Sequence, residues 1–198
     1  MHLRRNRYVF LWLGLVLSPV AGCGHLVYPS GPYSGQVVDA ETGQPVAGAA
    51  VVAIWTREIP VGAHMPEQSW DVYETLSDAN GEFTIPRRTH FTPFGWILEP
   101  TLNAYYPSYA AGYVGFYSRD VPVVDRPPRD PRDRDRPENY ATIPLKHLTT
   151  REERVLKAGP PIGTSELPWE KIPHLMRLIN TERRQLGLEP YRRSGVEP

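Results

Sequence analysis

The sequence predicts an all-β fold in which two packed sheets of short strands are followed by a short α-helical tail. Short apolar segments alternate with turn residues along most of the chain, which is typical of β-sandwiches. The 198 residues include 22 prolines, about twice the usual share of roughly 5%, and proline disfavours helix interiors. After residue 148 the apolar spacing changes to the helical period. This length suits one domain with tails.

Residues 34–85 carry the clearest pattern of strands and turns. Residues 39–45 lie between two apolar runs and supply Asp, Thr, Gly and Pro, which bond their own backbone, accept positive φ or fix φ. Residues 78–81 read Asp-Ala-Asn-Gly, and Asn-Gly is a strong short-range indicator of a hairpin. We therefore expect two consecutive hairpins.

The order and spacing of these residues resemble the carboxypeptidase regulatory-like domain. The shared pattern is G-x-V-x-D-x-x-T-G-x-P-x-x-G-A-x-V followed by T-x-S/T-D-x-x-G-x-F. It is met here by Gly35, Val37, Asp39, Thr42, Gly43, Pro45, Gly48, Ala49, Val51, Thr75, Ser77, Asp78, Gly81 and Phe83. The resemblance implies a seven-stranded β-sandwich of transthyretin/immunoglobulin-like topology over residues 34–147. Members of this family are usually accessory or adhesion modules, so it also implies a protein that is not an enzyme.

Aromatic residues crowd the later strand candidates, which are residues 96–106, 111–118 and 140–145. One interpretation is a platform on which sugar rings stack, formed by Trp96, Tyr105, Tyr106 and Tyr109. The other, which we favour, is that these rings fill the core and edges of the sandwich, where aromatic residues have high strand propensity. Residues 105–109 are the least strand-like piece and the best candidate for an exposed patch.

The first 22 residues have the features of a secretory signal peptide. Arginines at positions 4, 5 and 7 precede about ten apolar residues, half of what a ~30 Å hydrocarbon core requires. The run ends Val20-Ala21-Gly22-Cys23, which resembles the bacterial lipobox. The resemblance implies cleavage before Cys23, the only cysteine, and attachment of diacylglycerol and palmitate-type chains to it. The alternative is an ordinary cleavable signal with an incidental cysteine.

Residues 23–33 read as a polar tether that holds the sandwich away from the bilayer. Gly24, rather than aspartate, follows the lipidated cysteine. By similarity to enterobacterial lipoproteins this implies the outer membrane, facing the periplasm of a Gram-negative bacterium.

Two segments are expected to form surface loops. Residues 57–69 are longer than an ordinary hairpin loop. Residues 119–138 mix arginine, aspartate and proline, and we expect an extended, solvated excursion between the last two strands.

The tail, residues 148–198, is expected to contain two helices. Thr150 and Glu153 fit a capping box at the start of the first. The second is expected from about Trp169 or Pro173 to Leu186, ended by Gly187. Its apolar stripe either packs on the domain or docks onto a partner.

Little in the sequence points to catalysis. The net charge of +0 gives no support for a nucleic-acid partner. The histidines lack metal-ligand spacing, so we expect no metal and no cofactor. Tyr191-Arg192-Arg193-Ser194 is similar to the Tyr-Arg-Gly-Ser ending of transthyretin-like hydrolases, but its third residue differs and it follows a helix. Such a hydrolase would need a pocket that gathers His64 or His90 with Arg88 and a carboxylate.

These observations predict a lipid-anchored cell-envelope protein that acts as a non-catalytic structural or protein-interaction module. Its partners would be the membrane and an envelope protein or glycan. A carbohydrate-binding module is the first alternative, and it requires the four aromatic rings to be coplanar and exposed. A transthyretin-like hydrolase is the second.

Overall fold

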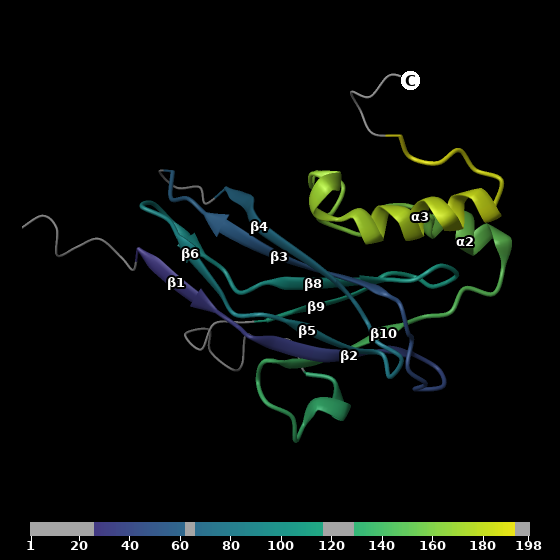
Figure 1. Cartoon of the computed structure of the whole chain (residues 1–198), viewed down its shortest axis with the longest axis horizontal. Coiled ribbons are helices and arrows are strands. Elements are labelled where there is room, and N and C mark those ends of the chain that lie inside the picture. The colour runs from purple at the N-terminus through teal and green to yellow at the C-terminus, as the bar shows by residue number, and fades with distance from the viewer. Residues whose placement is uncertain (1–25, 62–65, 117–128, 193–198) are drawn as a thin grey trace, which may run out of the picture.

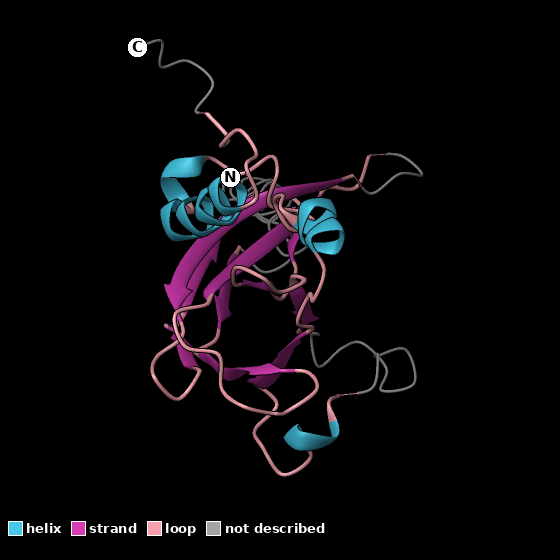
Figure 2. Cartoon of the chain, turned by 90° about the vertical axis from the view of Figure 1, so that its right-hand side faces the viewer, coloured by secondary structure: helices cyan, strands magenta, loops and turns pink. Residues whose placement is uncertain are grey.

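The computed structural model describes residues 26–61, 66–116 and 129–192. A three-stranded sheet, a larger sheet and a layer of helices are stacked on one another (Figure 1, Figure 2). The larger sheet is the middle layer, because its two faces pack against the other two. The mostly β architecture expected from the sequence is therefore confirmed.

The sequence predicts seven strands, whereas the described residues form ten, with two α-helices and two short 3₁₀ helices. In chain order they are β1 (Val27–Ser30), β2 (Tyr33–Asp39), β3 (Ala50–Glu58), β4 (Glu67–Leu76), β5 (Glu82–Ile85), β6 (Arg88–Phe91), β7 (Trp96–Ile97), β8 (Thr101–Tyr105), β9 (Gly112–Gly115), η3 (Pro131–Asp133), β10 (Tyr140–Leu145), α2 (Arg151–Lys157), η4 (Trp169–Lys171) and α3 (Pro173–Gln185). Short strands such as β6 escape prediction because they are polar and too brief to show a period.

The strands form three sheets. The smaller sheet has the order β10-β2-β5, with β10 parallel to β2 and β5 antiparallel to it. The larger sheet has the order β4-β3-β8-β9, and β7 pairs with the last two residues of β3, beyond the part that pairs with β8. β1 and β6 pair separately as an antiparallel ribbon.

β3 is buried on both faces, which explains its unbroken apolar sequence. Successive side chains of a strand point to opposite faces, so one set meets the smaller sheet and the other meets α3. The first set is Val51, Ala53 and Trp55, and the second is Ala50, Val52 and Ile54. Two hydrophobic cores thus share one strand.

Both predicted turns are present, but neither joins paired strands of one sheet. Residues 39–45 lead from β2 in the smaller sheet to β3 in the larger one, and residues 78–81 lead from β4 back to β5. The prediction of two hairpins is therefore wrong. Asp39 Oδ1 accepts a hydrogen bond from Thr42 N at 2.8 Å, and Asp78 Oδ1 accepts one from Asn80 N at 2.8 Å. These local bonds reverse the chain without selecting the strand that pairs with it.

Two predicted linkers are largely structured. The expected tether, residues 23–33, contains β1, whose pairing with β6 makes it part of the folded body. The expected loop, residues 57–69, is shortened because β3 and β4 continue to pair to Glu58 and Glu67 after a register shift at Trp55/Thr56. The tether prediction is therefore wrong from Val27 onward, and the predicted loop has bounds that are too wide. Strand pairing supplies backbone hydrogen bonds that the sequence alone does not reveal.

The described part of the expected solvated excursion, residues 129–138, is fixed to the sandwich. The carboxylate of Asp133 is 3% exposed and accepts hydrogen bonds from Thr142 N at 2.7 Å and Thr142 Oγ1 at 2.6 Å. The Arg129 guanidinium donates to the carbonyls of Pro137 and Tyr140. The prediction of a wholly solvated segment is therefore wrong for these residues.

The helical tail is confirmed. Thr150 and Glu153 form the predicted capping box at the start of α2. α3 begins at Pro173 and ends before Gly187, whose φ of +73° suits glycine. Its apolar stripe, including Leu175 and Ile179, is buried against β3 and β4. Of the two placements considered for this stripe, the helix packs on its own domain.

Candidate functional site

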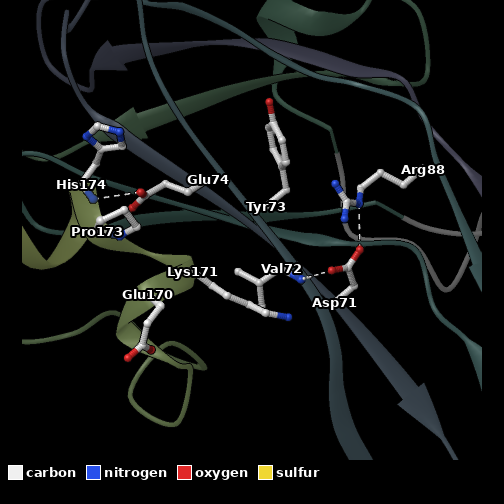
Figure 3. Close-up of a pocket in the computed structure, with 9 residues that line it drawn as sticks. All are labelled: Asp71, Val72, Tyr73, Glu74, Arg88, Glu170, Lys171, Pro173 and His174. Atoms are coloured by element: carbon white, nitrogen blue, oxygen red, sulfur yellow. Dashed lines mark hydrogen bonds and ion pairs between the residues drawn. The ribbon is translucent and has the colours of Figure 1, made fainter. Parts of the chain in front are cut away.

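A cavity of about 390 Å³ opens where β4 meets the start of α3 (Figure 3). Strand β4 and the η4–α3 junction form two of its walls, and Arg88 reaches it from β6. Most of its side chains are polar. The lining residues are Asp71, Val72, Tyr73, Glu74, Arg88, Glu170, Lys171, Pro173 and His174.

Glu74 joins the body to the helical tail inside this cavity. Its Oε2 accepts a hydrogen bond from His174 N at 2.8 Å, and its Oε1 accepts one from Leu175 N at 2.7 Å. The N-cap of α3 is Ile172, which supplies no side-chain acceptor. A carboxylate 100 residues earlier in the chain therefore satisfies the free amides of the helix and complements its dipole.

Asp71 lies at the other side of the cavity and holds Arg88. Asp71 Oδ2 accepts a hydrogen bond from Arg88 Nε at 2.7 Å, and His90 Nδ1 lies 3.6 Å from the same oxygen (Figure 3 shows the first pair). The His90 ring is 4% exposed, and among the residues that the structure describes its Nε2 meets no hydrogen-bond partner. Burial lowers the pKa of His90 below its ordinary value, which the nearby Asp71 carboxylate opposes.

Behind His90, a buried polar network links the β1–β2 corner to the core. Trp55, whose ring lies 5.1 Å from that of His90, donates from Nε1 to Ser30 Oγ at 2.8 Å. Ser30 Oγ also lies 2.6 Å from the Tyr33 hydroxyl oxygen, and both hydroxyls are within hydrogen-bond reach of Glu99, so their two protons are shared among three contacts. Burial, followed by the hydrogen bond to Glu99, raises the pKa of Tyr33 well above its ordinary value. The network satisfies polar groups that would be costly if left unpaired.

The arrangement meets the hydrolase hypothesis in part. His90, Arg88 and the carboxylate of Asp71 are brought together, as that hypothesis requires. Arg88 and Asp71 line the cavity, whereas the His90 ring lies beneath the surface. His64, the other histidine considered, lies outside the described residues.

The four residues considered for stacking do not form one exposed platform. Trp96 is 44% exposed on β7, whereas Tyr105 is 1% exposed and packs in the core beneath α3. Tyr105 faces the helix because it pairs with Ala50, a residue on the helix side of β3. Tyr106 and Tyr109 are half-buried and meet edge to face at 61°. The prediction that Tyr105 belongs to an exposed patch is wrong.

The remaining predicted site residues are placed as follows. Cys23 lies outside the described residues. The Arg183 guanidinium carbon lies 4.2 Å from the centre of the Tyr191 ring. Arg193 and Ser194 lie outside the described residues. Within the described ranges, no three His, Cys, Asp or Glu side chains are grouped as metal ligands. No helix in the same ranges is long and apolar enough to cross a membrane.

Comparisons with protein-family models, curated proteins and solved structures gave no match.

Sequence reasoning missed the acidic residues of β4 that build the cavity. A usable indication was present at the start of α3, where the sequence Lys171-Ile172-Pro173 offers no Ser, Thr, Asp or Asn at the N-cap. A helix that begins without its own cap leaves its first amides to water or to an acceptor from elsewhere in the chain. The sequence does not identify Glu74 as that acceptor.

Proposed function

We propose that this chain is a lipid-anchored cell-envelope protein whose β-sandwich and helical tail act as a non-catalytic structural or protein-interaction module. The observation that carries the proposal is the position of Cys23. It is the only cysteine of the chain and follows an apolar signal pattern that ends in small residues. Two or more acyl chains at that cysteine give stable membrane attachment.

The folded body supports a module of the carboxypeptidase regulatory-like kind. The residues that carry the resemblance have structural roles: Asp39 organises the first turn, Ser77 Oγ accepts from Ala49 N at 2.9 Å, and Gly81 has a φ of +72°. Gly35 lies so close to Ala141 that a side chain there would overlap its carbonyl oxygen. Because these residues shape turns and backbone packing, we interpret the shared pattern as one that specifies the fold.

The polar groups of the cavity also support a structural interpretation. Glu74 is bound to the amides of α3, and Asp71 is bound to Arg88. Each carboxylate thereby holds two separate elements together. The β-sandwich and the helical tail are thus joined into one unit. On this proposal a partner would bind that unit and not the apolar stripe of α3.

The anchor is tested by intact mass and fractionation of the protein made in a Gram-negative host. The mature form should begin at Cys23, carry the mass of acyl chains and sediment with outer-membrane vesicles in a density gradient. Cys23→Ala should lose the added mass and leave the membrane fraction. A Cys23→Ala protein that kept a lipid-sized mass would refute the anchor.

The partner is tested by crosslinking the lipidated protein in its own envelope and isolating it. The tail should be retained in this experiment, because Leu175 and Ile179 of α3 complete the second core. A defined protein crosslinked to the wild type supports the interaction module. Polysaccharide alone, lost in a Trp96→Ala variant, would instead support the carbohydrate-binding alternative.

A hydrolase is the second candidate, because His90, Asp71 and Arg88 gather beside an open cavity. The measurement is the rate of 5-hydroxyisourate decay with purified protein. An unchanged rate supports the non-catalytic proposal. Acceleration that is lost in His90→Ala, while the circular dichroism spectrum is unchanged, would support the hydrolase.

A further inference from the structure

Large apolar side chains are exposed at the end of the molecule where the described chain begins. We call this set the apolar end. It consists of Leu26 (42% exposed), Val27 (53%), Phe91 (61%), Phe94 (75%) and Trp96 (44%). Contiguous exposed apolar groups of this kind mark a surface that contacts another molecule or a membrane.

The pairing of β1 with β6 gathers these side chains. Val27 lies directly opposite Phe91 in the antiparallel ribbon, so both side chains project from the same face. The adjacent pair, Tyr28 and His90, projects from the other face, where His90 is buried. The outer face of the ribbon therefore begins with two exposed apolar groups, which no other described segment covers.

Hydrogen bonds bring the β6–β7 connection to the same end. Thr92 N donates to Leu26 O at 3.1 Å, and the Tyr28 hydroxyl donates to Gly95 O at 3.2 Å. These bonds hold the segment that carries Phe94 and Trp96 against β1. In Figure 1 the ribbon of β1 and β6 lies at the opposite end of the molecule from α2.

We propose that the apolar end rests in the surface of the bilayer that holds the lipid anchor. This inference rests on the proposed lipidation of Cys23. Leu26 is only three positions after Cys23, and a fully extended chain covers about 3.5 Å per residue. Leu26 therefore lies no more than about 10 Å along the chain from a cysteine whose acyl chains are in the membrane.

Because this distance is short, we infer that lipid, and not another protein, covers the apolar end. A single helix is about 10–12 Å across, so even the thinnest folded partner fills the whole available distance. Apolar faces of interfacial segments sink about 5–10 Å into the boundary between headgroups and acyl chains, which matches the reach from Cys23. Tryptophan and other aromatic rings are also favoured at that depth.

The consequence is a fixed orientation of the module on the membrane. The β1–β6 ribbon faces the lipid, while α2, at the opposite end of the molecule, stands away from it (Figure 1). On this proposal the predicted tether does not hold the body off the surface, since β1 already includes Val27, four positions after Cys23. Membrane contact is made by the protein as well as by its acyl chains.

The chain offers an internal reporter for this contact. The mature protein contains four tryptophans, of which Trp96 is at the apolar end and Trp169 is in η4 beside α3. The full lipidated protein is reconstituted in phosphatidylcholine vesicles with or without brominated acyl chains, which quench tryptophan at short range. The variants are Trp96→Phe and, as matched control, Trp169→Phe.

Bromolipid should quench the wild type and Trp169→Phe to a similar extent, and Trp96→Phe should lose most of that quenching. Equal quenching of Trp96→Phe and the wild type, or no quenching in either, would overturn the inference. Protection of Trp96 together with a crosslinked dimer would overturn it in favour of a second copy as occupant.

Intact mass and vesicle flotation are measured on the same samples, so the two proposals fail differently. A protein without acyl mass contradicts the lipid anchor itself. A protein that is acylated and floats with vesicles, yet shows no quenching of Trp96, leaves the anchor supported and refutes the contact. A Phe91→Ser/Phe94→Ser variant, with its fold checked by circular dichroism, should also lose quenching while it remains acylated.

Discussion

Arg154 of α2 binds the carboxylate of Glu182 on α3 through two hydrogen bonds of 2.8 Å each. Glu182 is 2% exposed, although it lies on a helix that is otherwise buried through apolar side chains. The hydrogen bond from Arg154 is charge-assisted and bidentate, the strongest common geometry for a side-chain pair. Glu182 in turn raises the pKa of Arg154, so this guanidinium stays charged. The pair joins the two helices of the tail.

Removing Arg154 should therefore destabilise the protein. Arg154→Ala leaves the Glu182 carboxylate buried without its partner, and we expect the free energy of unfolding to fall by about 3 kcal/mol. Urea denaturation followed by circular dichroism measures the change. The double variant Arg154→Met/Glu182→Leu should recover most of the loss, because no unpaired charge remains. A double variant no more stable than Arg154→Ala would contradict this account.

Glu74→Ala should loosen the start of α3. Loss of an N-cap acceptor typically costs about 1 kcal/mol, and here both bonded amides belong to the first turn. Hydrogen exchange should become faster at His174 and Leu175, and the unfolding midpoint should fall. Glu67→Ala is the matched control, since Glu67 is an exposed residue of the same strand. Similar exchange rates in the two variants would argue against capping by Glu74.

His90 should make the stability depend on pH. Burial lowers its pKa in the folded state, so the unfolded chain, with a pKa of about 6.5, binds the proton first as the pH falls. The free energy of unfolding should therefore decrease, by on the order of 1 kcal/mol, between about pH 7.5 and pH 5.5. Urea midpoints across this window measure it. His90→Phe should flatten the dependence, and an equally steep profile in that variant would assign it to other groups.

Gly35→Ala and Gly43→Ala should differ in severity. An added Cβ at Gly35 would lie 2.0 Å from Ala141 O and 2.5 Å from Phe83 Cζ, so β2 could not keep its place beside β10. We expect a loss of about 3 kcal/mol or failure to fold. At Gly43, φ is +71° with nothing within 4 Å, and the cost should be about 1 kcal/mol. Thermal denaturation compares the two, and equal losses would contradict the close packing at Gly35.

Local chemistry was the part of the fold that the sequence predicted well. Thr150 and Glu153 predict the start of a helix because both partners of the capping box lie within four residues of each other. Asp39 and Asp78 predict turns for the same reason, because each accepts hydrogen bonds from backbone amides a few residues later in the sequence. Interactions between residues this close in sequence can be predicted from the local sequence alone.

Long-range partners could not be predicted in the same way. Turn residues at 39–45 and 78–81 fit a hairpin and a sheet-to-sheet connection equally well, since both require only a chain reversal. Tyr105 belongs to the core because α3 covers that face of β8, which nothing near position 105 reveals. The cavity has the same cause: Asp71 and Glu74 meet Arg88 and His174 only after three distant segments pack together.

The parallel pairing of β2 with β10 also governs when this protein can complete its fold. Asn139, just before β10, donates to Pro32 O just before β2, and the two residues are 107 positions apart. The smaller sheet thus lacks an edge strand until nearly all of the sandwich sequence is available, and contacts this distant in sequence form slowly. In the order in which the chain is made, β2 has β5 as a neighbour long before it has β10. Completion of β10 therefore sets the earliest time at which the smaller sheet can close.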